Sequence, residues 1–313
     1  MDIEKHTVEI GHLSSGQMIS IPYISIDSKI DGPCIYIQSG IHGGEITLWI
    51  LKALVEFLKS KPLLKGKLRL VTCANPLSWL QRSYYYTHGK FSSYNGVDWN
   101  RLFPGSENKD GGSRIASALF SLAKDSDFVI DLHTARKSFP FAIYTSNTPK
   151  DFVKAMGFKY NQLLDVSLKA SYKGTLNAQL DILNIPNVTL ECGSHDSCNQ
   201  NDNKYCLDGI LRLLNMYGMI EQKNISNTEV WSFENTLKLY ANDGGLIQYH
   251  CDIGDRVKEG DLLYTIINPI DIEVETNEFA SFNGVILKRA PTHIMNFGDE
   301  TIEVIRDEAI SIL

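Results

Sequence analysis

The chain has 313 residues, of which 43% are hydrophobic and 21% charged, so it has the composition of a folded protein and the length for one large domain or two. Its formal net charge of -7 excludes the basic surface of a typical nucleic-acid-binding protein, and an anionic substrate would need local positive charge. No apolar run approaches the roughly 18 residues of a membrane helix, and residues 1–6 are polar without a signal-peptide core. The six cysteines form no Cys-x-x-Cys pair and are interpreted as reduced thiols. We therefore expect a cytoplasmic protein without a membrane or nucleic-acid partner.

From about residue 33 to residue 220, short apolar runs alternate with helix-like segments. The apolar runs are rich in Val, Ile, Leu and aromatic residues, as buried strands are. This alternation predicts an α/β/α sandwich with a mixed, largely parallel sheet. The predicted strands are Cys34–Gln38, Lys67–Cys73, Phe128–Leu132, Phe141–Thr145 and Asn187–Leu190. The predicted helices are Glu45–Ser60, Gly112–Lys124, Pro149–Met156, Leu176–Leu183 and Asn203–Tyr217.

The segment Gly40–Glu45 lies between the first predicted strand and the first predicted helix. Its glycines allow a sharp turn, and Glu45 is expected in the first helical turn, with its side chain directed back toward His42. A His and a Glu at this spacing can bind one metal ion, although an ordinary turn before a helix would have the same pattern. The same spacing at His6 and Glu9 lies in an alternating segment without glycines and predicts a surface strand.

Chemically capable residues follow four predicted strands at the same end: His42, Asn75, His133 and Glu191. Ligands gather at the carboxyl ends of the strands in such sheets, so this coincidence predicts a site there. Asp131 lies on the same face of its strand as His133 and could orient that histidine.

His133 is the candidate third metal ligand, and its alternative interpretation is a hydrogen-bonded histidine at a strand end. Two His and one Glu form the protein ligand set of several catalytic zinc sites, in which the fourth position stays open. Glu191 could take a proton from an attacking water and pass it to a leaving amine, or it could be a salt-bridged acid at the rim of the sheet.

A polar loop contains Asn100 and Arg101, which together suit the recognition of a carboxylate, although a solvated loop is the alternative. Arg82 is interpreted either as the group that stabilises a developing oxyanion or as a surface arginine. The tyrosines at positions 84–86 are expected to pack within their loop.

After residue 224 the helical periodicity disappears, and short apolar runs alternate with Gly and Asp turns. This pattern predicts an all-β domain over residues 225–313, after a catalytic domain over residues 1–224. The β domain resembles a flattened barrel of the biotinyl/lipoyl type. The expected hairpin, Glu273–Ala280, contains no Lys, so a carrier role with a swinging prosthetic group is disfavoured.

Together these motifs resemble the succinylglutamate desuccinylase/aspartoacylase family of zinc carboxypeptidase-like hydrolases. They occur in the family's order as Gly40-x-His42-Gly43-x-Glu45, Asn75-Pro76, Asp98-x-Asn100-Arg101-x-Phe103-Pro104-Gly105, Asp131-Leu132-His133-Thr134 and Glu191-x-Gly193. The resemblance implies one Zn²⁺ per chain on His42, Glu45 and His133, with Glu191 as general base and with Asn100 and Arg101 on a substrate carboxylate. The chain departs from the family where Gln81–Tyr84 replaces a Gly-Thr-Arg-Tyr segment and a longer insert, Tyr85–Gly96, follows. This departure weakens the match of Arg82 to the family arginine that would stabilise the oxyanion.

We therefore predict a zinc-dependent hydrolase that cleaves the amide bond of a small N-acyl amino acid or a related acyl compound. The β domain is expected to cover the active-site entrance. The alternatives are a zinc carboxypeptidase acting on short peptides and a non-catalytic binding protein that kept the fold. The sequence leaves open the acyl group, the amino acid and whether the chain forms a homo-oligomer.

Overall fold

The computed structural model describes the whole chain except residues 85, 166–169, 222–228 and 274. The chain divides into two compact units, the first made of Met1–Thr134 and Pro140–Val230 and the second of Ala135–Phe139 and Trp231–Leu313. The short segment 135–139 therefore interrupts the first unit and belongs to the second. The predicted boundary between residues 224 and 225 lies outside the described residues.

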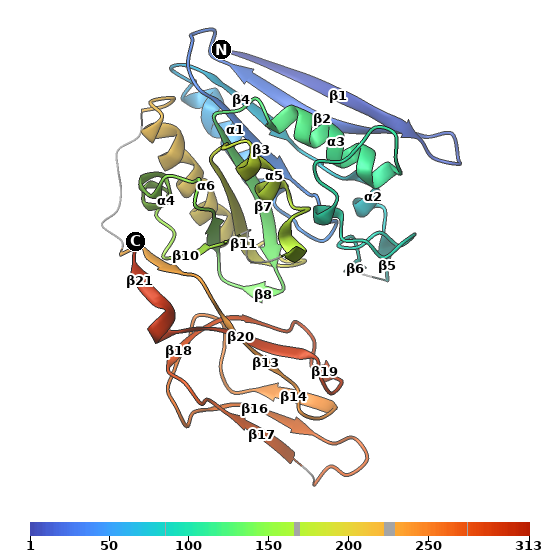
Figure 1. Cartoon of the computed structure of the whole chain (residues 1–313), viewed down its shortest axis with the longest axis vertical. Coiled ribbons are helices and arrows are strands. Elements are labelled where there is room, and N and C mark those ends of the chain that lie inside the picture. Colours follow the sequence, from blue (N-terminus) through green and yellow to red (C-terminus); the bar gives the residue numbers. More distant parts are fainter. Residues whose placement is uncertain (85, 166–169, 222–228, 274) are drawn as a thin grey trace. The chain divides into compact units, whose positions relative to one another are not determined.

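The first unit is built on one large mixed sheet (Figure 1). Its strands are β1 (Asp2–His12), β2 (Met18–Asp27), β3 (Cys34–Ser39), β4 (Lys67–Val71), β7 (Phe128–Ala135), β9 (Phe141–Tyr144), β10 (Tyr160–Leu163) and β11 (Asn187–Ser194). They lie in the order β1-β2-β4-β3-β7-β11-β9-β10. Strand β3 is parallel to both β4 and β7, whereas β1 and β2 form an antiparallel pair that continues antiparallel onto β4. The mixed α/β class predicted from the sequence is confirmed.

Helices cover both faces of this sheet. They are α1 (Leu48–Ser60), α2 (Pro76–Trp79), α3 (Gly111–Ala123), α4 (Lys150–Met156), α5 (Leu176–Ile182) and α6 (Gln200–Met216), with short 3₁₀ turns at Trp99–Arg101 and Ala170–Tyr172 and a small hairpin of β5 (Arg82–Ser83) and β6 (Tyr86–Thr87). Helices α3 and α5 share a hydrophobic core with Tyr36 of β3, Val71 of β4 and Val129 of β7. Helices α1 and α4 pack on α6, and Figure 1 shows α4 and α6 on one side of the strands and α3 on the other. Within the described residues, no helix is both long and apolar enough to span a membrane.

Two details differ from the sequence prediction and affect the site. Helix α1 begins at Leu48, after its N-cap Thr47, so Glu45 does not lie in its first turn. Glu45 belongs to a tight turn in which its own N–H faces the carbonyl of His42 at 3.4 Å and its carbonyl accepts from Thr47 N at 3.0 Å. Strands β7 and β11 continue past their apolar runs to Ala135 and Ser194, because backbone pairing does not stop where hydrophobic side chains do.

The second unit is all β. Its strands are β8 (Lys137–Ser138), β12 (Trp231–Phe233), β13 (Leu237–Tyr240), β14 (Gly245–Tyr249), β15 (Arg256–Val257), β16 (Leu262–Ile267), β17 (Glu275–Phe279), β18 (Gly284–Arg289), β19 (Ile294–Met295), β20 (Glu300–Arg306) and β21 (Ile310–Ile312), with a 3₁₀ turn at Asp307–Ala309. One sheet runs β13-β20-β18-β15, with β8 added on β18, and another runs β17-β16-β14-β19. The two sheets share one hydrophobic core, to which Ile247 of β14 and Ile302 of β20 both contribute. The resemblance to the biotinyl/lipoyl type stays a prediction.

Candidate metal centre and active site

Three buried side chains converge near the carboxyl ends of the central strands β3 and β7 of the large sheet. His42 and Glu45 come from the loop between β3 and α1, and His133 comes from β7. Glu45 lies between the two histidines, with Oε1 2.7 Å from Nδ1 of His42 and Oε2 2.9 Å from Nδ1 of His133. The potential ligand atoms of the three side chains all lie within 4.8 Å of one another, so they could hold one metal ion.

The loop that carries His42 and Glu45 is fixed by a close approach of the neighbouring chain. Gly40 has a φ of +79°, and a Cβ there would lie 2.7 Å from the Trp79 ring, so only glycine fits. Asn75 donates through its backbone N to the Gly40 carbonyl at 3.1 Å and through Nδ2 to the Ile41 carbonyl at 3.2 Å. The structure therefore gives the Asn75 that follows β4 a role in holding the loop Gly40–Glu45, here called the metal loop after its two candidate ligands.

Each histidine is oriented by a carboxylate on the ring atom that faces away from Glu45. His42 Nε2 donates to Asp98 Oδ1 at 3.0 Å, and His133 Nε2 donates to Asp131 Oδ2 at 2.9 Å. Gln38 in turn donates to the second oxygen of Asp131 at 2.8 Å. Because a carboxylate only accepts, a neutral ring that donates from Nε2 presents the lone pair of Nδ1 to the centre, which is the tautomer that a metal ion at Nδ1 requires.

Sequence reasoning predicted the contact of Asp131 with His133 but missed the contact of Asp98 with His42. Asp98 also accepts from the backbone N of Asn100 at 2.9 Å and thereby caps the short turn at Trp99–Arg101. The available signal was its place at the start of the Asp-x-Asn-Arg segment.

A divalent cation fits this donor set. Oε2 of Glu45 is buried and makes no hydrogen bond within the described residues, although it lies 2.9 Å from His133 Nδ1. With the ring hydrogen on Nε2, that contact joins two lone pairs, and a buried acceptor without a hydrogen is unfavourable unless a cation lies between the groups. Two imidazoles and one carboxylate are ligands that zinc prefers.

The ionisation of the cluster reflects this crowding of charge. Burial opposes the charged form of Glu45, but His133 and His42 outweigh it and hold the pKa of Glu45 well below its usual range. Burial likewise opposes protonation of His42 and His133, yet the nearby carboxylates raise the pKa of both histidines. Asp98 loses solvation too, but its hydrogen bond and charge interaction with His42 lower its pKa to about 2. The charges of neighbouring groups thus shift the pKa of each of the three cluster residues.

The structure places the predicted Asn100 directly beside the cluster. Its Oδ1 accepts from the backbone N of Leu176 at 3.2 Å, and its Nδ2 lies 3.3 Å from His133 Nε2. The predicted Arg101 is about one-third exposed, donates to the Asn100 carbonyl at 2.7 Å and lies 3.7 Å from Asp98. Arg101 therefore extends from the same turn that orients His42.

Glu191 belongs to β11 and pairs with Phe141 of β9. Its Oε2 is buried without a hydrogen-bond partner among the described residues. The pKa of the neighbouring Cys192 thiol is raised well above its usual range, first by burial, then by Cys206, and further by the charges of Glu191 and Glu45. The charges of both carboxylates therefore act on the same thiol.

Arg82 is exposed on β5, and no ion pair or side-chain hydrogen bond links it to the cluster within the part of the chain that the structure describes. It lines a pocket of about 520 Å³. The other lining residues are Leu77, Leu80, Gln81, His88, Ser92, Ser93, Tyr94 and Trp99.

The insert that follows Arg82 begins at Tyr85, which lies outside the described residues. Its Gly89 docks on the metal loop, where the Gly89 carbonyl accepts from Gly43 N at 3.2 Å.

The family model for the succinylglutamate desuccinylase/aspartoacylase catalytic domain matches residues 31–217, which include every predicted site residue. The chain belongs to this family of deacylases. This match confirms the family assignment made from the sequence motifs. Members of the family are hydrolases. A search of curated proteins found no match.

Several solved structures share the fold along nearly the whole chain. A family protein from Shewanella amazonensis SB2B is 24% identical, covers 99% of this chain and 100% of its own, and superposes with a TM-score of 0.89. A family protein from Shewanella frigidimarina NCIMB 400 is 22% identical over 99% and 98% of the two chains, with a TM-score of 0.88. The product-bound ectoine utilization protein EutE (DoeB) from Ruegeria pomeroyi is 19% identical over 96% and 94%, with a TM-score of 0.81.

Proposed function

We propose that this protein is a zinc-dependent hydrolase that cleaves the amide bond of a small N-acyl amino acid or a related acyl compound. One observation carries the proposal: a buried cluster of His42, Glu45 and His133 in which Asp98 and Asp131 hold the Nε2 atoms of the two rings and both Nδ1 atoms face Glu45. One zinc ion per chain, held by these three residues, would supply Lewis-acid activation of the scissile carbonyl and of an attacking water. The family match favours a deacylase over a carboxypeptidase, for which the same ligand set would serve.

Glu191 is the proposed general base. It takes the proton of the attacking water and passes it to the departing nitrogen, so that the amine leaves neutral. Its buried Oε2, which has no hydrogen-bond partner among the residues that the structure describes, supports this role, because a base must keep an acceptor atom for the reacting water.

Asn100 and Arg101 are the proposed anchors for a substrate carboxylate. The Asn100 amide lies 3.3 Å from His133 Nε2, but that nitrogen already donates its hydrogen to Asp131 and cannot accept one. The amide hydrogens of Asn100 thus remain for a substrate oxygen, beside the planar donor group of Arg101. Such anchoring would hold the amide in place for attack.

Arg82 is proposed to stabilise negative charge that develops on the carbonyl oxygen. Its exposed side chain precedes an insert that docks on Gly43, which supports a place near the substrate. We further propose that the second unit limits access to the centre and so restricts substrates to small anions.

The experiment that tests the proposal is a metal analysis of purified wild type beside His42→Ala, followed by assays of amine release from a panel of N-acyl amino acids. We expect about one zinc per wild-type chain, lost in the variant, and amine release that depends on zinc. Equal metal in both proteins, or no uptake of added zinc by the wild type, would refute the hydrolase and favour a binding protein. Faster release from short peptides than from N-acyl amino acids would instead identify a carboxypeptidase.

A further inference from the structure

The residues that follow β11 contact both segments that carry metal ligands. His195 Nδ1 lies 3.2 Å from Oγ1 of Thr134, the neighbour of His133. The next residue, Asp196, donates its backbone N–H to the carbonyl of Gly44 at 3.0 Å. Asp196 has a φ of +51°, a left-handed conformation that costs free energy in a residue other than glycine and persists only where its surroundings fix it.

The ring of His195 occupies the space in which Gly44 would carry a side chain. A Cβ on Gly44 would lie 2.3 Å from His195 Nε2 and 2.9 Å from its Cδ2 and Cε1. Gly44 is not among the glycines with a positive φ, so its backbone would accept alanine. The histidine ring, and not the backbone conformation, therefore requires glycine at this position.

We propose that His195 is a positioning residue for the metal centre. Its ring lies against Gly44, next to Glu45, while Nδ1 is held by Thr134, next to His133. One side chain thereby sets the spacing between the two segments that carry the three ligands. The same ring follows Glu191 by four positions, so it also ties the strand of the general base to the ligands.

This inference rests on the proposed metal site, because the spacing that His195 sets matters only if the ligands bind an ion together. Groups that orient metal ligands typically affect metal affinity by about 10–100-fold when they are removed. If the ring only filled space, its removal would affect folding, and a replacement side chain of similar volume would leave the metal affinity unchanged.

The test measures zinc affinity by competition with a chromophoric chelator, alongside the unfolding temperature of the zinc-free protein. Gly44→Ala is expected to weaken zinc binding about 10–100-fold, because the added Cβ displaces either the ring or the loop. His195→Asn keeps a polar atom within reach of Thr134 and removes Nε2, so the double variant should recover most of the affinity that Gly44→Ala loses. Gly111→Ala is the matched control, since its Cβ meets nothing closer than 3.4 Å.

His195→Phe separates positioning from space filling. Phenylalanine keeps a ring of similar size and loses the bond to Thr134, so we expect about tenfold weaker zinc binding at an unchanged zinc-free unfolding temperature. Wild-type affinity in His195→Phe, or a double variant no better than Gly44→Ala alone, would overturn the positioning role and leave the proposed function intact. A wild-type protein that takes up no zinc would refute the proposed function and the positioning role together.

Discussion

Each histidine of the centre depends on one carboxylate behind it, and Asp131 is the more deeply buried of the two. Asp131 accepts from His133 Nε2 on one oxygen and from Gln38 on the other. Asparagine has a single acceptor oxygen, so in Asp131→Asn an amide group would face one of these donors. We expect zinc affinity to fall by about 10–100-fold, measured by chelator competition.

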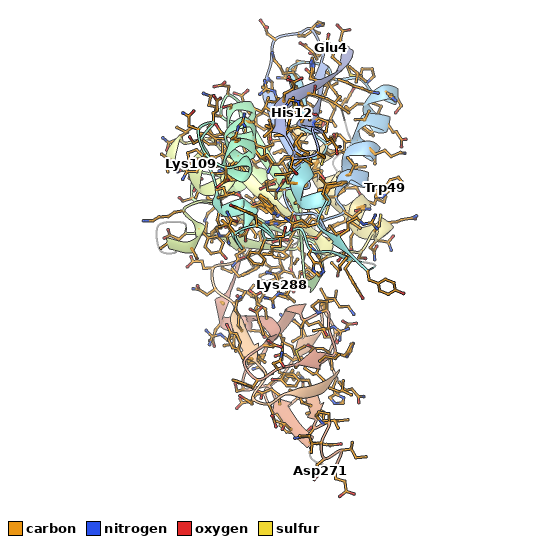
Figure 2. The ribbon with its side chains drawn as sticks, turned by 90° about the vertical axis from the view of Figure 1, so that its right-hand side faces the viewer. Glu4, His12, Trp49, Lys109, Asp271 and Lys288 are labelled. Carbon is orange, nitrogen blue, oxygen red and sulfur yellow. The ribbon has the colours of Figure 1, made fainter. Side chains whose placement is uncertain are left out.

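The matched control for this change is Asp271→Asn. Asp271 is exposed at the tip of the connection between β16 and β17 (Figure 2). The control loses the same charge and should bind zinc like the wild type. Equal affinity in Asp131→Asn and the control would show that the carboxylate does not orient His133.

Glu191→Gln should separate catalysis from metal binding. The amide cannot accept the proton of the attacking water, so kcat should fall by about 10²–10⁴-fold, the usual contribution of a general base. Zinc content should stay at the wild-type level because Glu191 is not a proposed ligand. A variant that keeps its kcat, or that loses its zinc, would contradict the assigned role.

The raised pKa values of His42 and His133 predict the pH dependence of metal binding. A raised folded-state pKa stabilises the zinc-free fold fully below the unfolded value of about 6.5, and this stabilisation is lost as the pH rises through the folded values. Zinc binds only the neutral rings, so its affinity rises over the same interval. The gain in unfolding temperature on adding zinc should therefore grow as the pH rises above the unfolded-state value of about 6.5. A gain that is constant with pH would exclude proton competition at these histidines.

At the scale of elements, the sequence predicted those parts of the site that local spacing determines. His42 and Glu45 are three residues apart in one turn, and Asp131 and His133 are two residues apart on the same face of one strand, so each pair could be inferred without the fold. The contact of Asp98 with His42 joins residues 56 positions apart, and that of His195 with Thr134 joins residues 61 apart. Such contacts depend on how loops close over the sheet, which hydrophobic periodicity does not encode.

The insert provides a prediction at the same scale. A Cβ on Gly89 would lie 2.4 Å from Gly43 N and 2.5 Å from the Ser78 carbonyl, both of them backbone atoms that cannot rotate away. Gly89→Ala should therefore push the insert off the metal loop and lower the free energy of unfolding by about 1–3 kcal/mol. Denaturant unfolding beside the Gly111→Ala control measures this. Wild-type stability in Gly89→Ala would show that the insert does not pack tightly on the loop.

At the scale of the whole molecule, the strand that carries His133 continues directly into the second unit. β8 follows β7 and pairs with β18, where Ser138 faces Lys288 and Lys137 faces Arg289. Ser138 is buried, and its hydroxyl donates to the Leu287 carbonyl at 2.9 Å. Removal of residues 231–313 alone would therefore leave β8 without its partner strand, only a few residues from the proposed ligand His133.

This connection decides how the proposed restriction to small substrates can be tested. The measured quantity is the kcat/KM for N-acyl dipeptides divided by the kcat/KM for N-acyl amino acids. We expect this ratio to be at least about tenfold higher in a chain ending at Val230 than in the full chain. The ratio cancels any general loss of activity that the unpaired β8 causes, and Ser138→Ala in the full chain is the control for that loss alone. Ser138→Ala leaves the Leu287 carbonyl without this donor, which costs about 1–3 kcal/mol of stability, but it should not change the ratio. An unchanged ratio in a folded, zinc-loaded truncation would mean that the first unit alone sets substrate size, through residues such as Asn100 and Arg101.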